Sequence, residues 1–185
     1  VSEFKYSPIV ERPSVLKINC DASFMAVSGT GGWGYVIRDS DGDVVQTGRG
    51  KLDHVIDSFQ PELVACLQGQ ALGGASSMLL AQSGTRVSVP LASPLHGISH
   101  AILKTDALLV QQAATSDADD LAPMGGLVQE LKELVSLNFN SFSFNCQPRD
   151  CNKVAHALAS LGCACSVEDN PVCGCASSLY SSSSC

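Results

Sequence analysis

Three strand-forming segments joined by short turns occupy the chain before residue 51, and they constrain the fold more than any other feature. Segment 15–24 alternates apolar with polar residues, and segment 33–38 is rich in aromatic and β-branched residues. Segment 44–50 follows Asp41 and Gly42, and Asp-Gly is the strongest short-range signal for a hairpin. The chain is therefore predicted to begin with three antiparallel strands.

After residue 51 the hydrophobic pattern changes to helices that alternate with strands. Apolar residues at roughly helical spacing from Pro61 predict a helix of about fifteen residues, with Glu62 in its first turn. The elements predicted next are a strand over 98–105, helices over 107–114 and 127–135, a strand over 141–146, and a last helix over 152–161 that Gly162 ends. A chain of 185 residues with these elements is one α/β domain.

The domain is predicted to cover residues 14–162, and three segments are predicted to contribute none of its strands or helices. Residues 1–13 form an irregular leader, and residues 77–95, with a glycine, two prolines and no helical stripe, form an inserted loop. Residues 163–185 form a Cys- and Ser-rich tail that we expect to be disordered. The tail's Cys-x-Cys pairs do not match the usual zinc spacing, so all nine cysteines are interpreted as reduced thiols.

Charge and hydropathy limit the partners of the chain. Eleven basic and eighteen acidic residues give a net charge of −7, the wrong sign for gripping nucleic acid by counterion release alone. A nucleic-acid partner must therefore be held locally or through metal ions. No run of apolar residues approaches the roughly 20 needed to span a membrane, so we expect a soluble, intracellular monomer with no membrane partner.

Three carboxylates fall at positions that a mixed sheet can bring together. Asp21 lies within a strand, where aspartate is unfavourable unless it is paired or binds a metal. Glu62 opens a helix, and Asp106 follows a strand. Three clustered carboxylates stay ionised only with cations among them, and Mg²⁺ prefers such ligands. The alternatives are a simple helix-start charge for Glu62 and a helix N-cap for Asp106.

Several motifs in order resemble the type 1 ribonuclease H domain, most closely its plant, retroelement-related branch. The motifs are Lys17-Ile-Asn-Cys-Asp-Ala-Ser-Phe24, Gly32-Trp-Gly-Tyr-Val-Ile-Arg-Asp39, Pro61-Glu-Leu63, Lys104-Thr-Asp-Ala107 and Arg149-Asp-Cys-Asn-Lys-Val-Ala-His-Ala-Leu-Ala159. The resemblance implies a five-stranded mixed sheet in the order 3-2-1-4-5, flanked by helices.

The resemblance also implies a metal-dependent endoribonuclease that cleaves the RNA strand of RNA-DNA hybrids. Asp21 would contact two Mg²⁺ ions, with Mn²⁺ as a substitute, and Glu62 and Asp106 would complete the metal site. The products would carry 5′-phosphate and 3′-hydroxyl ends. The nucleic-acid contacts implied are Ser23, Arg149, Asn152 and Lys153, although the last three residues can equally form a solvated helix start.

Two features depart from the family pattern. His156 stands where active relatives usually supply a fourth acidic ligand, and it can either join the catalytic site or form a hydrogen bond beside it. Residues 116–126 are acidic, where the family carries a basic handle for the hybrid. These departures leave two alternatives open: a catalytically weak nucleic-acid-binding module with the same fold, and a truncated relic. Glycines between Gly29 and Gly34 suit either tight turns or close approach of nucleic acid.

Overall fold

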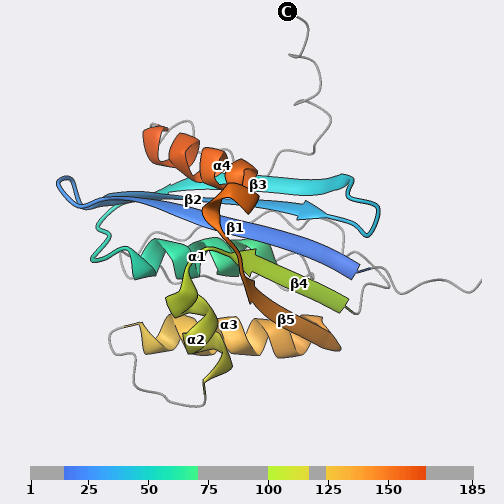
Figure 1. The fold of residues 1–185 in the computed structure, drawn as a ribbon. Coiled ribbons are helices and arrows are strands. Elements are labelled where there is room, and N and C mark those ends of the chain that lie inside the picture. Colours follow the sequence, from blue (N-terminus) through green and yellow to red (C-terminus); the bar gives the residue numbers. More distant parts are fainter. Residues whose placement is uncertain (1–14, 71–99, 117–123, 166–185) are drawn as a thin grey trace, which may run out of the picture.

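The computed structural model describes residues 15–70, 100–116 and 124–165 of the chain. These residues form one five-stranded sheet with helices on both faces (Figure 1). In chain order the elements are β1 (Val15–Met25), β2 (Thr30–Arg38), β3 (Val44–Leu52), α1 (Phe59–Gln70), β4 (His100–Thr105), α2 (Leu108–Thr115), α3 (Gly125–Asn138), β5 (Ser141–Cys146), the 3₁₀ helix η2 (Arg149–Cys151) and α4 (Lys153–Ala164).

The sheet is mixed, and its order is β3-β2-β1-β4-β5. Strands β1, β2 and β3 pair antiparallel, as the turn at Asp41 and Gly42 predicts. Strand β4 pairs parallel to the other edge of β1, and β5 pairs parallel to β4. Both the α/β class and the ribonuclease H strand order are thus confirmed.

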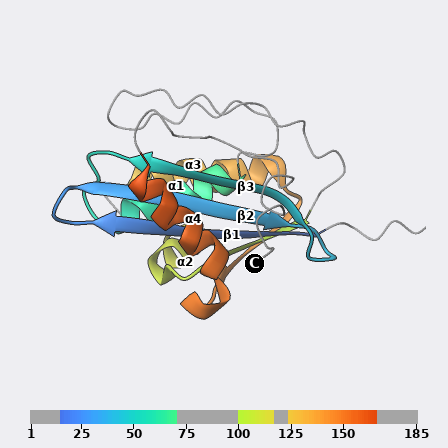
Figure 2. The same ribbon diagram turned by 90° about the horizontal axis from the view of Figure 1, so that it is seen from above.

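Two unequal helical layers cover the sheet. Helices α1, α2 and α3 lie on one face, and α4 alone lies on the other, across β1, β2 and β3 (Figures 1 and 2). The core lies between the sheet and the first layer, where Ile18, Leu63, Leu103 and Leu131 are fully buried. Burying each such side chain stabilises the fold by about 1.5–3 kcal/mol. This core fixes α1 against β1 and so sets the height of Glu62 relative to Asp21.

Glycines let α4 lie unusually close to β2. A Cβ atom added at Gly32 would lie 2.3 Å from the carbonyl oxygen of Ala159, and one at Gly34 would lie 2.4 Å from the Ala159 nitrogen. Real Cβ atoms do not approach backbone so closely, so only glycine fits at these two positions. Of the expected roles for this glycine run, a turn holds for Gly29, whose φ is +62°. Gly32 and Gly34 instead make room for a helix.

The end of α4 differs from the prediction for the same reason. The helix continues past Gly162 to Ala164, so Gly162 does not end it. A Cβ atom at Gly162 would lie 2.5 Å from the Gly50 carbonyl oxygen in β3. The close contact between α4 and β3 therefore explains a glycine at position 162. A left-handed conformation at the end of the helix does not explain it.

Several expectations fall on residues that the structure does not describe. The leader, the inserted loop 77–95, the acidic residues 117–123 and the tail from 166 onward lie outside the described residues. Among the cysteines it does describe, Cys20 and Cys66 are buried, Cys151 is exposed, and all are free thiols. None of the described helices combines the length and the apolar character needed to cross a membrane.

Candidate metal centre

The three predicted carboxylates converge at one point of the sheet. One carboxylate oxygen from each of Asp21, Glu62 and Asp106 lies within 4.8 Å of the other two. Pairing between β1 and β4 extends from Val15 and His100 to Asn19 and Lys104. Just beyond this ladder, β4 ends and Asp106 follows, two residues after Lys104, as Asp21 is two residues after Asn19. The parallel register therefore places the two aspartates side by side.

Asp21 is the most enclosed member of the cluster. Its side chain is fully buried in the middle of β1. The backbone N–H of Ala22 donates to Oδ1 at 2.8 Å, and Nδ1 of His156 lies 2.9 Å from Oδ2. Burial raises the pKa of Asp21, the negative charge of Asp106 raises it further, and the bond from Ala22 and the neighbouring His156 oppose this rise. The site thus makes ionisation of Asp21 costly.

Glu62 reaches the cluster from the first turn of α1. Burial, followed by the charges of Asp21 and Asp106, raises its pKa to about 8, although Arg149 opposes the rise. Its Oε2 atom is buried without a hydrogen-bond partner, as is Oδ1 of Asp106. Buried carboxylate oxygens normally have partners, because an unpaired one loses its hydration with nothing in return. Two unpartnered oxygens facing a third carboxylate form a donor set that suits a hard divalent cation.

Asp106 is free to face this cluster because another residue serves the start of α2. The N-cap of α2 is Ala107, which makes no capping bond through its side chain. Its N–H is instead bonded to Oγ1 of Thr105 at 3.0 Å. The N-cap interpretation of Asp106 is therefore wrong. The Asp106 carboxylate forms an ion pair with Arg149, whose Nε lies 3.6 Å from Oδ2.

Asn152 ties the start of α4 to β1. It is 2% exposed. Its Nδ2 donates to the carbonyl oxygen of Cys20 at 2.7 Å, and its Oδ1 accepts from Nδ2 of Asn19 at 3.0 Å. These bonds hold the first turn of α4, and with it His156, beside Asp21. Neither interpretation offered for Asn152, a phosphate contact or a solvated cap, fits a buried side chain with these partners.

Of the other predicted nucleic-acid contacts, Arg149 borders the carboxylate cluster, and Lys153 and Ser23 lie on α4 and β1. Arg149 in η2 is well exposed, with 65% of its side chain accessible, and it borders Asp106. Lys153, at the start of α4, is exposed and lies 3.8 Å from the carboxylate of Asp150. The side chain of Asp150 is itself 93% exposed. Ser23 lies two residues beyond Asp21 on β1, opposite Gly32.

Comparison with known proteins gives this arrangement a family. A family model described as reverse transcriptase-like matches residues 19–74 and 92–162. The chain belongs to this family. The match includes all three carboxylates and His156, and its interruption after residue 74 overlaps the predicted insertion. A comparison with curated proteins found no match.

Solved structures similar to this chain include several ribonucleases H. RNase H1 from the archaeon Halobacterium salinarum is 21% identical, with a TM-score of 0.61, over 80% of this chain and 96% of that one. The N-terminal RNase H domain of a Mycobacterium tuberculosis protein is 17% identical, with a TM-score of 0.63, over 81% and 94%. LC11-RNase H1, solved in complex with an RNA/DNA hybrid, is 15% identical, with a TM-score of 0.61, over 80% and 96%. These likenesses establish a ribonuclease H fold.

Proposed function

We propose that this chain is a metal-dependent endoribonuclease that cleaves the RNA strand of RNA-DNA hybrids. The observation that carries the proposal is the convergence of Asp21, Glu62 and Asp106 within 4.8 Å, on a ribonuclease H fold, with two buried oxygens left unpartnered. Three acids that only repel one another would be a liability in a folded protein. The cost is explained if divalent cations bind between them.

Each carboxylate has a distinct part in this proposal. Asp21 lies on β1 and would contact both of two Mg²⁺ ions, and Glu62 and Asp106 would complete the metal site. When bound, paired divalent ions lower the pKa of an attacking water and stabilise the departing oxygen. The bond from Ala22 holds the Asp21 carboxylate in place, and Mn²⁺ is a plausible substitute for Mg²⁺.

Exposed groups beside the carboxylates would orient the hybrid. Arg149 is placed to contact a phosphate, since most of its side chain is accessible and it lies next to Asp106. Lys153 and Ser23 flank the site on the α4 and β1 sides. The hybrid in the LC11-RNase H1 structure supports this choice of partner.

A second candidate function is recognition of nucleic acid with weak or no cleavage. The observation that favours it is His156, which stands where active relatives usually supply an acid and lies 2.9 Å from Oδ2 of Asp21. In this position it competes with a cation for that oxygen. Neutral imidazole also suits transition metals better than Mg²⁺.

A cleavage assay separates the two candidates. A labelled RNA-DNA hybrid is incubated with the protein in Mg²⁺ and then in Mn²⁺, with Asp21→Asn as the matched control. Metal-dependent cutting of the RNA strand that Asp21→Asn removes supports the nuclease. Binding of the hybrid without cutting in either metal refutes it and supports the recognition module.

The proposal includes the organisation of the chain. We propose that residues 14–162 form the functional monomer, that 77–95 is an insertion relative to the family, and that the chain belongs to the plant, retroelement-related branch. The interruption of the family match between residues 74 and 92 supports the insertion.

A further inference from the structure

We infer that the α4 side of the sheet, from the part of β1 and β2 beside the start of α4 across to β4 and β5, is a second contact surface for the phosphate backbone of nucleic acid. This surface, called the open face below, is formed by Arg38, Lys17, Asn19, Ile102, Lys104, Ser143 and Asn145. The inference rests on the proposed function, because it extends the path of the same substrate beyond the metal centre.

Strand register defines the open face. In one row across the sheet Arg38, Lys17, Ile102 and Ser143 are neighbours, and in the next row Asn19, Lys104 and Asn145 are neighbours. Their strand neighbours Leu16, Ile18 and Leu103 are buried on the opposite face, beneath α1 to α3. Because α4 packs on β1, β2 and β3, the described helices leave β4 and β5 bare on this side (Figure 1).

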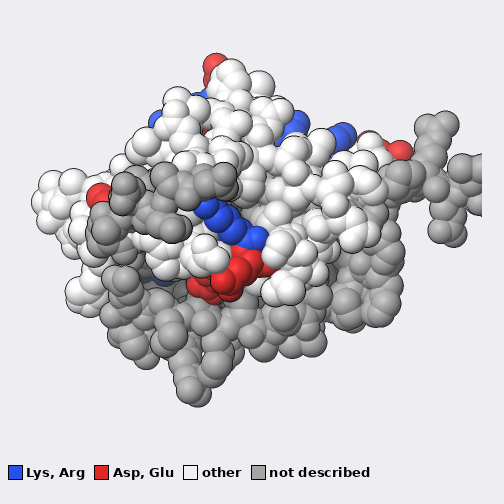
Figure 3. All heavy atoms as spheres, turned by 90° about the horizontal axis from the view of Figure 1, so that it is seen from below, with Lys and Arg blue, Asp and Glu red and all other residues white. Residues whose placement is uncertain are grey.

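Positive charge gathers here, in contrast to the rest of an acidic chain. The described residues include eight lysines and arginines, and five of them lie on the open face or at its border with η2 and α4: Lys17, Arg38, Lys104, Arg149 and Lys153. The view from below, toward α2 and α3, shows instead a group of acidic side chains near its centre with a basic one against it (Figure 3). The charge of the molecule is therefore distributed unevenly.

Two cations on the open face point to an anionic ligand. Lys17 and Arg38 are directly opposite each other on β1 and β2. Like charges in this arrangement destabilise a sheet unless an anion lies between or above them. Within the described part of the chain, Lys17 and Lys104 form no ion pair. Arg38 donates a hydrogen bond to the Gly42 carbonyl oxygen and borders the acidic hairpin 39–43. The inference of an anionic ligand therefore depends on Lys17 and Lys104.

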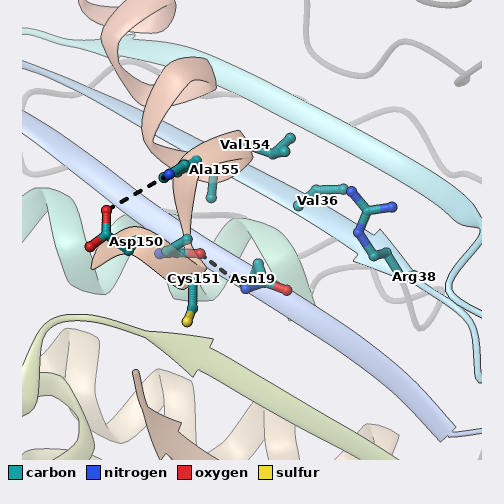
Figure 4. A pocket seen from close by; sticks show the side chains of 9 residues that line it. Asn19, Val36, Arg38, Asp150, Cys151, Val154 and Ala155 are labelled. Atoms are coloured by element: carbon teal, nitrogen blue, oxygen red, sulfur yellow. Dashed lines mark hydrogen bonds and ion pairs between the residues drawn. The ribbon is translucent and has the colours of Figure 1, made fainter. Parts of the chain in front are cut away.

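A hollow of about 150 Å³ deepens this surface between Arg38 and the start of α4. Asn19 and Val36 form its floor, and residues 150–155 form its wall (Figure 4). The figure shows the Arg38 side chain at one end of the hollow and Asp150 at the other. The Arg38 end of the hollow is therefore cationic, and Arg38 is the strand neighbour of Lys17 on the open face.

The open face is continuous with the metal centre, and this continuity identifies its occupant. Along their strands Lys104 is about 7 Å from Asp106, and Lys17 is about 13 Å from Asp21. A nucleic-acid strand held at the carboxylates can therefore reach both lysines within its next few nucleotides. Among the residues that the structure describes, this face offers no aromatic side chain for stacking, since Phe142 and Phe144 alternate to the other side of β5. It therefore suits a sequence-independent contact to phosphates.

The test measures binding apart from cleavage. The full chain carries Asp21→Asn, so that the hybrid stays intact, and its affinity is measured over a salt series. The double variant Lys17→Gln, Lys104→Gln is compared with Lys132→Gln, which removes a positive charge on α3. Loss of two phosphate contacts is expected to weaken binding and to lower the slope of log affinity against log salt by about two. Unfolding temperatures of all variants confirm that each is folded.

Hybrid length provides a second readout. Lengthening the hybrid from a few base pairs until it spans the open face is expected to increase affinity for the Asp21→Asn chain but not for the double variant. The same salt slope and the same length dependence in the double variant and in Lys132→Gln would overturn the inference, as would no binding at all. If the unmodified chain never cuts in Mg²⁺ or Mn²⁺ but the slope still falls, the nuclease proposal fails and the open face stands.

Discussion

Nδ1 of His156 lies 2.9 Å from Oδ2 of the fully buried Asp21, and this contact is the main departure from a four-acid site. It supplies a hydrogen bond to a carboxylate whose pKa is raised by burial and by Asp106. In the absence of metal, histidine at this position therefore avoids the repulsion that a fourth acid would add to the cluster. In the proposed metal site, the same contact would compete with a cation for Oδ2 of Asp21.

Replacing His156 by aspartate is expected to reverse this compromise. Without metal, the variant His156→Asp should unfold at a lower temperature than the unmodified chain, because four acids now repel one another. With Mg²⁺ it should gain more stability than the unmodified chain, and a difference of about 1 kcal/mol corresponds to roughly 3 °C. Thermal unfolding with and without Mg²⁺ measures both effects. His156→Asn is the neutral control, and an equal Mg²⁺ shift in both variants would contradict the prediction.

The raised pKa of Glu62 predicts how the stability of the metal-free protein depends on pH. Below about pH 4.5 the carboxyl is protonated in both the folded and unfolded chains, so this contribution is fully present. As pH rises to about 8, the unfolded chain releases its proton first, and stability falls by up to a few kcal/mol. Denaturant unfolding in EDTA from pH 5 to 8 measures this fall.

The matched variant for the pH prediction is Glu62→Gln, which keeps the shape of the side chain but cannot titrate. Its stability should change less with pH than that of the unmodified chain. Asp21, whose pKa is raised too, contributes a remaining slope in the same direction. Mg²⁺ should stabilise the unmodified chain most at the upper end of the range, where the carboxylates are ionised. Parallel pH curves for the two proteins would show that Glu62 is not the group responsible.

Removing the buried amide of Asn152 should loosen α4. Asn152→Ala leaves the Cys20 carbonyl oxygen and the Asn19 amide without their bonds, which should cost about 2–3 kcal/mol. Lys153→Ala, at the exposed neighbouring position, should change stability by no more than about 0.5 kcal/mol. Urea unfolding compares the two variants. Equal stability of both variants would mean that the amide does not anchor the helix.

Most of the fold follows from local patterns in the sequence. The Asp-Gly turn and the alternating segments predict three antiparallel strands, and the change to helical spacing at Pro61 predicts α1. The ribonuclease H motifs then give the strand order, which periodicity alone does not contain. They also predict that the three carboxylates converge. This convergence depends on the register between β1 and β4, which no local pattern contains.

The errors arise where contact between distant residues decides the role of a residue. Gly162 has the local signature of a helix end, yet its nearest neighbour is the backbone of Gly50, more than a hundred positions away. Asn152 has the signature of a helix start, but the partners of its side chain are on β1. In both cases the sequence shows the residue type but not the surface against which it packs.

The close contact between α4 and β2 gives the last prediction. In Gly34→Ala the new Cβ would lie 2.4 Å from the Ala159 nitrogen and 2.7 Å from the Ala155 carbonyl oxygen, so α4 must move away from the sheet. Overpacking of this kind typically costs about 1–3 kcal/mol. Because the new Cβ would meet backbone atoms of α4, we expect a cost near the upper end of this range. Because His156 follows Ala155, the displacement should also lengthen its contact with Asp21.

The control for this variant is Gly126→Ala in the first turn of α3, where an added Cβ would meet nothing within 4 Å. That substitution should be neutral or stabilise the protein by up to about 1 kcal/mol, since alanine favours helix more than glycine does. Urea unfolding of both variants measures the difference. The NMR chemical shifts of the His156 ring report whether its contact with Asp21 has changed. A Gly34→Ala protein with unaltered stability and unaltered His156 ring chemical shifts would show that α4 is not held against β2 as the structure places it.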